Sequence, residues 1–90
     1  MVEKGVGMDK LLVMVYVPMI EETFDMYIPT VKKVGAVKEL ILKIIEENTE
    51  GLFVDDGCKY LYDKVTGNLI SDEAFVKTSG IKNGSKLILN

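Results

Sequence analysis

Two strands open the pattern of hydrophobic and polar positions along the chain. Leu11–Val17 is hydrophobic or aromatic at every position, which predicts a strand that is apolar on both faces. Pro18 follows it and breaks the pattern. Thr23–Ile28 instead alternates, with an inward set of Phe24, Met26 and Ile28. Because only a short loop separates the two strands, the pattern predicts an antiparallel hairpin.

The strong helical pattern begins at Val34 and runs to about Asn48. Charged residues occupy one side of this segment, and Gly51 is a suitable stop just beyond it. Hydrophobic residues on the other side fall within about 60° of one line on a helical wheel. They are Val34, Val37, Ile41, Ile44 and Ile45. A stripe of this width covers one face of a sheet.

The remaining segments are short. We expect a third strand over Tyr60–Asp63, a brief fourth at Leu69–Ile70, a helical turn from Ser71 to Phe75, and a fifth strand over Ser85–Leu89. The first and last strands are the most apolar, so they are expected to lie next to each other in the centre of the sheet. The order of elements predicts an α+β fold, a β-grasp in which one helix packs on one face of a mixed five-stranded sheet.

Length and composition fit one folded domain. The chain has 90 residues, 48% hydrophobic and 28% charged, with only two prolines. Residues 1–9 carry two glycines and mixed charge, which predicts a flexible leader ahead of a domain over residues 10–90.

In its order of elements, the chain from Leu11 onward resembles the ubiquitin-like superfamily. Within it, the chain is most similar to the YukD/EsaB family, small accessory proteins of bacterial type VII (WXG100) secretion. The similarity lies in Thr23–Pro29, which matches an aromatic–Asp–Leu–x–Val–Pro second strand, and in the closing segment Gly84–Leu89. The resemblance implies a cytoplasmic role in secretion. Conjugating ubiquitins end in Gly-Gly, whereas this sequence stops at Asn90, so the resemblance does not favour a modifier or sulfur carrier.

The chain lacks the residues that several classes of function usually require. The chain has no histidine, and Cys58 is its single cysteine, so we expect no enzymatic activity, no metal and no cofactor. A net charge of -3 with scattered lysines argues against nucleic acid. No segment reaches the roughly 18 apolar residues that span a bilayer, so no membrane insertion is expected. Asp55-Asp56-Gly57 is interpreted as a turn.

The first strand suggests a docking surface, since the helix can cover only one side of it. Pairing with Phe24 and Met26 favours Met14 and Tyr16 inward, although one bulge would reverse this orientation. The expected protein-binding residues are the outward valines and the nearby aromatic and aliphatic residues: Val13, Val15, Val17, Tyr27, Tyr60, Tyr62 and Ile88. The alternative is that neighbouring side chains, such as the stem of Lys86, shield this row.

These observations predict a non-enzymatic protein-binding adaptor. The resemblance implies a membrane component of type VII secretion as its partner, and a weak homodimer is a further option. Two other functions stay open. One is a ubiquitin-like modifier or sulfur carrier, and the other is a regulatory β-grasp module of a larger enzyme.

Overall fold

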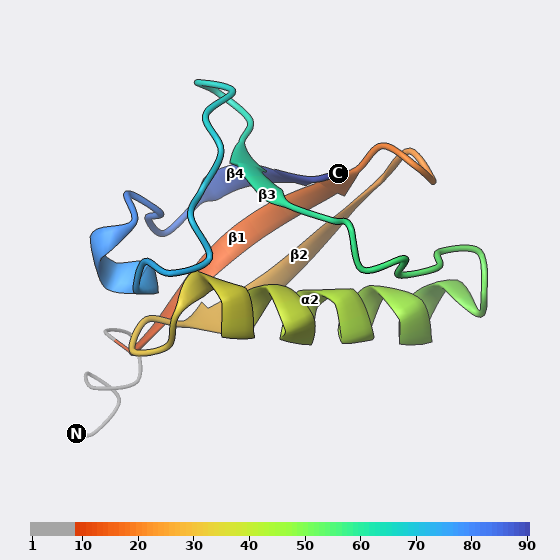
Figure 1. Ribbon diagram of the computed structural model, residues 1–90, viewed down its shortest axis with the longest axis horizontal. Helices are drawn as coiled ribbons and strands as arrows, with labels where there is room; N and C mark the ends of the chain where they lie inside the picture. Colours follow the sequence, from red (N-terminus) through yellow and green to blue (C-terminus); the bar gives the residue numbers. More distant parts are fainter. Residues whose placement is uncertain (1–8) are drawn as a thin grey trace.

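The computed structural model describes residues 9–90, so the predicted leader lies, except for Asp9, outside the described residues. The chain forms two strands, a long helix, a short strand, a single 3₁₀ turn and a last strand (Figure 1). The elements are β1 (Lys10–Val17), β2 (Glu22–Pro29), α2 (Val34–Thr49), β3 (Leu61–Asp63), η1 (Val76–Thr78) and β4 (Ser85–Leu89).

The sheet has the order β2-β1-β4-β3. β1 pairs antiparallel with β2 and parallel with β4, and β3 pairs antiparallel with β4. The sheet is therefore mixed, as predicted, and the first and last strands form its centre. Both central strands are rich in β-branched and aliphatic residues, which suit a position with a neighbour on each side.

The strand expected at Leu69–Ile70 is absent, so the sheet formed within residues 9–90 has four strands instead of the expected five. Leu69 forms only an isolated bridge with Tyr62. The backbone around it does approach β3, because Asp63 N–H donates to Asn68 O and Ile70 N–H donates to Leu61 O. The segment diverges after Ile70, whose side chain is buried in the core. One residue of pairing is too short to count as a strand.

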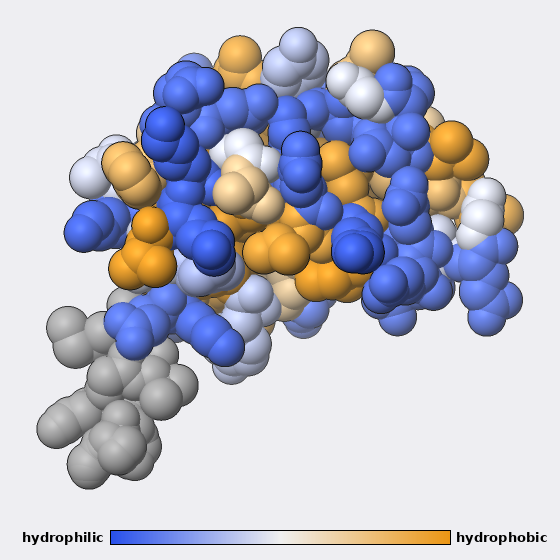
Figure 2. Space-filling view, turned by 60° about the horizontal axis from the view of Figure 1, so that its bottom comes forward, coloured by the Kyte–Doolittle hydropathy of each residue, from blue (hydrophilic) through white to orange (hydrophobic). Residues whose placement is uncertain are grey.

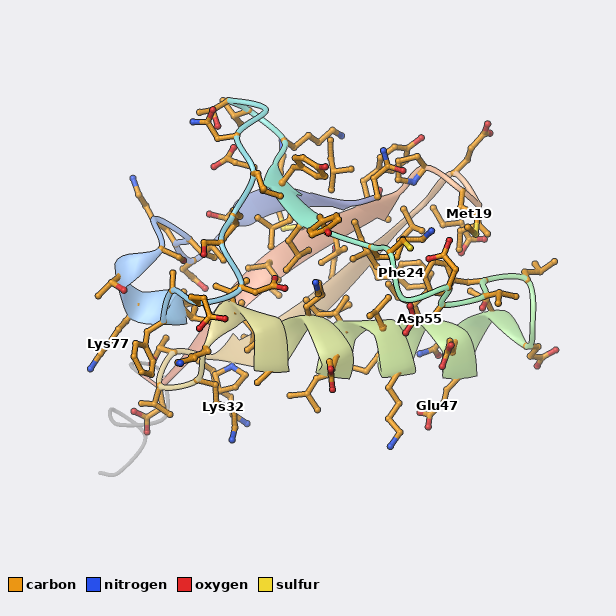
Figure 3. All side chains as sticks on the ribbon, in the orientation of Figure 1. Met19, Phe24, Lys32, Glu47, Asp55 and Lys77 are labelled. Atoms are coloured by element: carbon orange, nitrogen blue, oxygen red, sulfur yellow. The ribbon has the colours of Figure 1, made fainter. Side chains whose placement is uncertain are left out.

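Helix α2 covers one face of the sheet, and the side chains between the two layers form the core. Four residues of the predicted stripe, Val34, Val37, Ile41 and Ile45, are at most 1% exposed. The fifth, Ile44, is 37% exposed, while Leu42 is buried in its place. The buried side of the helix is thus rotated toward Leu42. On the opposite side, Lys32, just before α2, and Glu47 point away from the sheet (Figure 3).

The first turn of α2 is capped by backbone from a distant segment. Val34 N–H donates to Ala74 O at 2.8 Å, and Gly35 N–H donates to Asp72 O at 3.0 Å. These bonds satisfy donors that a helix start leaves open, and Lys33 provides no side-chain cap. A Cβ on Gly35 would lie 3.2 Å from the Asp72 Cβ, so the glycine permits this close approach.

The predicted helical turn at Ser71–Phe75 is wrong in its position. Residues 72–74 form a turn in which Ser71 Oγ accepts from Glu73 N–H, and the 3₁₀ turn η1 follows at Val76–Thr78. The physical reason is the capping role just described. The carbonyls of Asp72 and Ala74 are engaged by α2 and are not available for a local helix.

The C-terminal end of α2 leads into a loop anchored by one aromatic residue. Glu50 adopts a left-handed conformation and ends the helix. The buried hydroxyl of Thr49 donates to Ile45 O and accepts from Phe53 N–H. These bonds direct Phe53, 2% exposed, into the core.

Candidate protein-binding face

The orientation of β1 is opposite to the one favoured from the sequence. Val13, Val15 and Val17 are fully buried against α2, so they cannot form the exposed docking row predicted for them. The cause is the length of the hairpin loop. Residues 18–21 separate the strands, so Val15 lies opposite Phe24 and Val13 opposite Met26. Directly opposed residues share a face, and no bulge intervenes.

The outer face of the sheet is consequently formed by Leu12, Met14 and Tyr16 of β1. The strand registers place one continuous row across the sheet: Thr23, Tyr16, Ile88, Tyr62 and Leu69. Each of these residues is at least partly exposed, and Leu69 is 57% exposed. The row reaches from the β2 edge to the β3 edge on the side that α2 does not cover.

Two predicted site residues, Ile88 and Tyr62, occupy the middle of this row. Tyr27 lies on the same face beside Leu12 and is 67% exposed. Tyr60 does not join them. Its ring lies beside the helix, with Lys38 Nζ 5.0 Å from the ring centroid. A cation at this distance stabilises the ring position, so Tyr60 belongs to the helix side of the molecule.

Two lysines border the row. Lys64 Nζ lies 5.1 Å from the centroid of the Tyr16 ring, so this side chain extends over part of the face. With Lys86, Met14, Tyr16 and Thr23 it lines an open hollow of about 210 Å³. Lys86, whose stem was the alternative shield for an outward row, thus lies beside this face together with Lys64. Neither lysine forms an ion pair among residues 9–90.

Met14 and Tyr16 lie on the surface, whereas the pairing expected from the sequence favoured the core for both. Hairpin loop length was the signal that could have located them, since an even number of loop residues sets the parity of the pairing. The position of Lys64 over this face could not be predicted from the sequence. Lys64 lies in a turn, and its contact with Tyr16 exists only once the sheet has formed.

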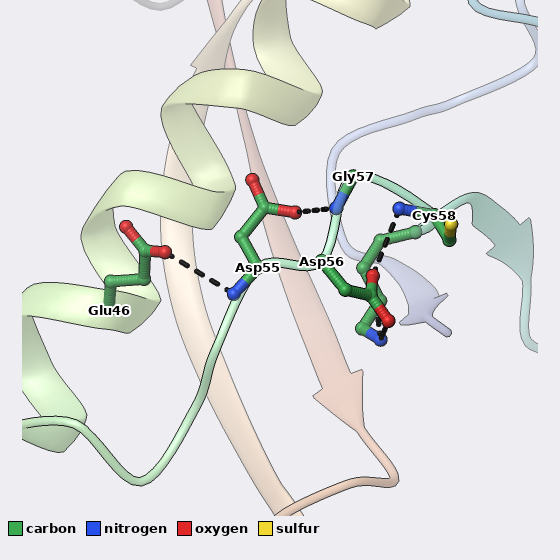
Figure 4. Close-up of polar contacts among 6 residues, drawn as sticks. Glu46, Asp55, Asp56, Gly57 and Cys58 are labelled. Atoms are coloured by element: carbon green, nitrogen blue, oxygen red, sulfur yellow. Dashed lines mark hydrogen bonds and ion pairs between the residues drawn. The ribbon is translucent and has the colours of Figure 1, made fainter.

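The acidic loop after α2 bends at Gly57, and two aspartate side chains hold its backbone (Figure 4). Gly57 N–H donates to Asp55 Oδ1 and Cys58 N–H donates to Asp56 Oδ1, both at 2.9 Å. The Cys58 amide, and secondarily the charge of Lys59, hold the pKa of Asp56 below its ordinary value of 3.8. These carboxylates thus serve the turn itself.

Residues 9–90 contain no cluster of three or more His, Cys, Asp or Glu side chains placed to hold a metal ion. Within the same residues, no helix has the length and apolarity to cross a membrane.

A mixed sheet of this order, with one helix on a single face, is the fold of a ubiquitin-like domain. The sequence matches no protein-family model and no curated protein.

Solved structures, in contrast, include domains that are similar to this chain in fold. The ubiquitin-like domain of the Mycobacterium tuberculosis type VII secretion protein EccD1 is 13% identical with a TM-score of 0.68, and the match covers 89% of this chain and 96% of that one. A ubiquitin-like domain of an Arabidopsis thaliana protein is 21% identical with a TM-score of 0.67, over 90% of this chain and 76% of that one.

A chain of the ESX-5 inner membrane complex is 12% identical with a TM-score of 0.77. The match covers 91% of the present chain but only 21% of that chain, so the present chain spans about a fifth of its length. At these identities the likeness establishes the fold alone.

Proposed function

We propose that the protein is a non-enzymatic, protein-binding adaptor of bacterial type VII secretion, that it acts in the cytoplasm, and that it docks through the outer face of its sheet. The proposal rests on the row formed by Tyr16, Ile88, Tyr62 and Leu69. A contiguous apolar row on a small domain marks a contact surface, and tyrosines are enriched where binding energy concentrates.

The type VII assignment is supported by the ubiquitin-like domains of secretion proteins among the structural neighbours. The second-strand motif Thr23–Pro29 favours the YukD/EsaB family within this setting. The partner proposed is accordingly a membrane component of the secretion machine. The aromatic row would meet apolar side chains of that component, and Lys64 and Lys86 would lie beside its carboxylates.

A second candidate function follows from one comparison. Because the chain matches only about a fifth of the ESX-5 component, the fold also occurs as one part of a larger membrane-complex protein. The present domain would then be a docking module within a longer polypeptide. The intact mass of the protein from its native host distinguishes the two, since the chain alone is 10.0 kDa.

The test of the adaptor proposal is affinity capture from native host lysate with a triple variant, Tyr16→Ser, Tyr62→Ser and Ile88→Ser. We expect recovery of secretion-machine subunits to fall about tenfold or more, because the variant removes the central row. A matched variant with two exposed loop residues changed, Val54→Ser and Val65→Ser, should capture normally. Circular dichroism verifies that both proteins are folded. Unchanged capture by the folded triple variant would refute the proposal.

A further inference from the structure

The other exposed surface of interest lies where α2 approaches β2. β2 is an edge strand, and β1 is its single strand neighbour among residues 9–90. Figure 2, which turns the α2 side of the molecule forward, shows hydrophobic side chains gathered in a band across its middle. We call the free edge of β2, together with Phe24, Leu40 and Ile44, the α2–β2 surface.

Hydrogen bonding in the hairpin determines which backbone groups of β2 are free. Thr30 N–H donates to Asp9 O at 2.9 Å, and extending the β1–β2 register places these two residues opposite each other. Hydrogen-bonded pairs alternate with non-bonded pairs in an antiparallel ladder, so Phe24 and Met26 also bond to β1. The N–H and C=O groups of Thr23, Asp25 and Tyr27 therefore point away from β1, toward the open edge.

The helix supplies an apolar border to this edge. Lys38 bonds to Asp72 Oδ2 at 2.9 Å and lies over Tyr60, so the Lys38 side of α2 faces β3. At about 100° per residue, Leu40 and Ile44 lie on the other side of the buried stripe, which faces β2. They are 46% and 37% exposed. The inward side chain of Phe24, partly buried, lies on the sheet side of the same surface.

Charge distinguishes the strands that could pair here. β2 carries Glu22 and Asp25 and no basic residue. Asp25 lies opposite Met14 and has no ion-pair partner among residues 9–90. A second copy pairing through its own β2 would bring the same carboxylates and no cation. The charge at this edge favours a strand with basic side chains on the outer face of the sheet.

We propose that the α2–β2 surface binds an extended segment of another protein as an added fifth strand. The segment would bond to the backbone of Thr23, Asp25 and Tyr27. It would place alternate hydrophobic residues against Leu40, Ile44 and Phe24, and lysine or arginine residues beside Asp25. Pro29 ends the ladder, because it has no N–H to donate. This site adjoins the proposed adaptor face at Thr23 and Tyr27 but uses the free backbone edge of β2, and it stands whether or not that face binds.

The test titrates the isotope-labelled protein with the capped peptide acetyl-KVKVKVT-amide and follows backbone amide signals by NMR. We expect the largest shifts at Thr23, Asp25 and Tyr27, together with changes at Leu40 and Ile44. The peptide acetyl-EVEVEVT-amide is the charge control and is expected to bind about tenfold more weakly.

Variants separate backbone pairing from simple charge attraction. Asp25→Pro and Thr23→Pro each remove a donor at the free edge without removing one that bonds to β1, and each should raise the peptide Kd about tenfold. Leu40→Ser should weaken binding similarly, because it removes apolar contact without adding a charge, whereas Val65→Ser, at an exposed loop residue, should not. Asp25→Lys should reverse the preference between the two peptides.

Absence of binding up to millimolar peptide would overturn the proposal. So would binding that the folded proline variants leave unchanged, or shifts centred on Tyr16 and Tyr62. The triple variant of the adaptor face should bind the peptide normally, so failure of one proposal is distinguishable from failure of the other.

Discussion

The inner and outer faces of the sheet are built from alternate residues of the same strands and have opposite environments. On β1, Val13, Val15 and Val17 are fully buried under α2, while Leu12, Met14 and Tyr16 remain partly exposed. Hydrophobic content alone does not distinguish the two sets. The difference arises from one helix that can cover only one face, so stability depends on the inner set and the outer set is available for contact.

The largest expected difference in the free energy of unfolding comes from placing a carboxylate on each face of the sheet in turn. Val15→Asp buries an unpaired carboxylate and should cost about 4 kcal/mol or more, enough to unfold much of a small domain. Tyr16→Asp, one residue away, should cost only about 1 kcal/mol, since the new carboxylate is solvated and lies near Lys64. Urea denaturation measures both. Equal losses would show that the two faces do not differ as described.

Truncation in β4 gives a smaller difference between the same faces. Leu87→Ala removes a fully buried side chain and should lower the free energy of unfolding by about 3 kcal/mol. Ile88→Ala, on the outer face, should lower it by about 1 kcal/mol. Thermal denaturation of the two variants orders them. A larger loss for Ile88→Ala would indicate that the outer row is sealed by its own neighbours.

The smallest effect concerns a residue that belongs to neither face. The pKa of Asp56 is lowered, so the contribution of its turn is present above pH 3.8 and is lost as the pH falls through the lower folded-state value. Asp56→Asn should therefore remove pH dependence from the Cys58 amide signal in this range while the core signals stay unchanged. NMR titration compares the two proteins. A core that responds to Asp56→Asn would contradict the separation of the turn from the inner face.

Much of the fold follows from local pattern. The stripe of α2 and the placement of the first and last strands in the centre depend on hydrophobic periodicity, and both were predicted. The strand predicted at Leu69–Ile70 is wrong, because these residues have strand-like chemistry but only Leu69 pairs, through an isolated bridge. The helical turn at Ser71–Phe75 failed because the Asp72 and Ala74 carbonyls cap α2, a contact between distant segments.

The candidate site was predicted less well than the fold. A strand that is apolar on both faces gives no internal evidence of which face is buried, so the choice between Val15 and Tyr16 depended on the hairpin register. Tyr62, Tyr27 and Ile88 were placed on the outer face correctly, and their register confirms it, since Tyr62 pairs with Ile88 and Tyr27 lies opposite Leu12. Tyr60 was not, because its ring position is set by Lys38 of the helix.

The parallel pairing of β1 with β4 also constrains how the chain acquires its structure during synthesis. The central ladder joins Val13 to Ser85, so a strand made early must wait for residues that lie far later in the chain. Until residue 89 has left the ribosome, β1 has no partner on its β4 side, and the unpaired N–H and C=O groups of this apolar strand are open to other chains. The nascent protein is consequently vulnerable to aggregation, and early chaperone binding would protect it at this stage.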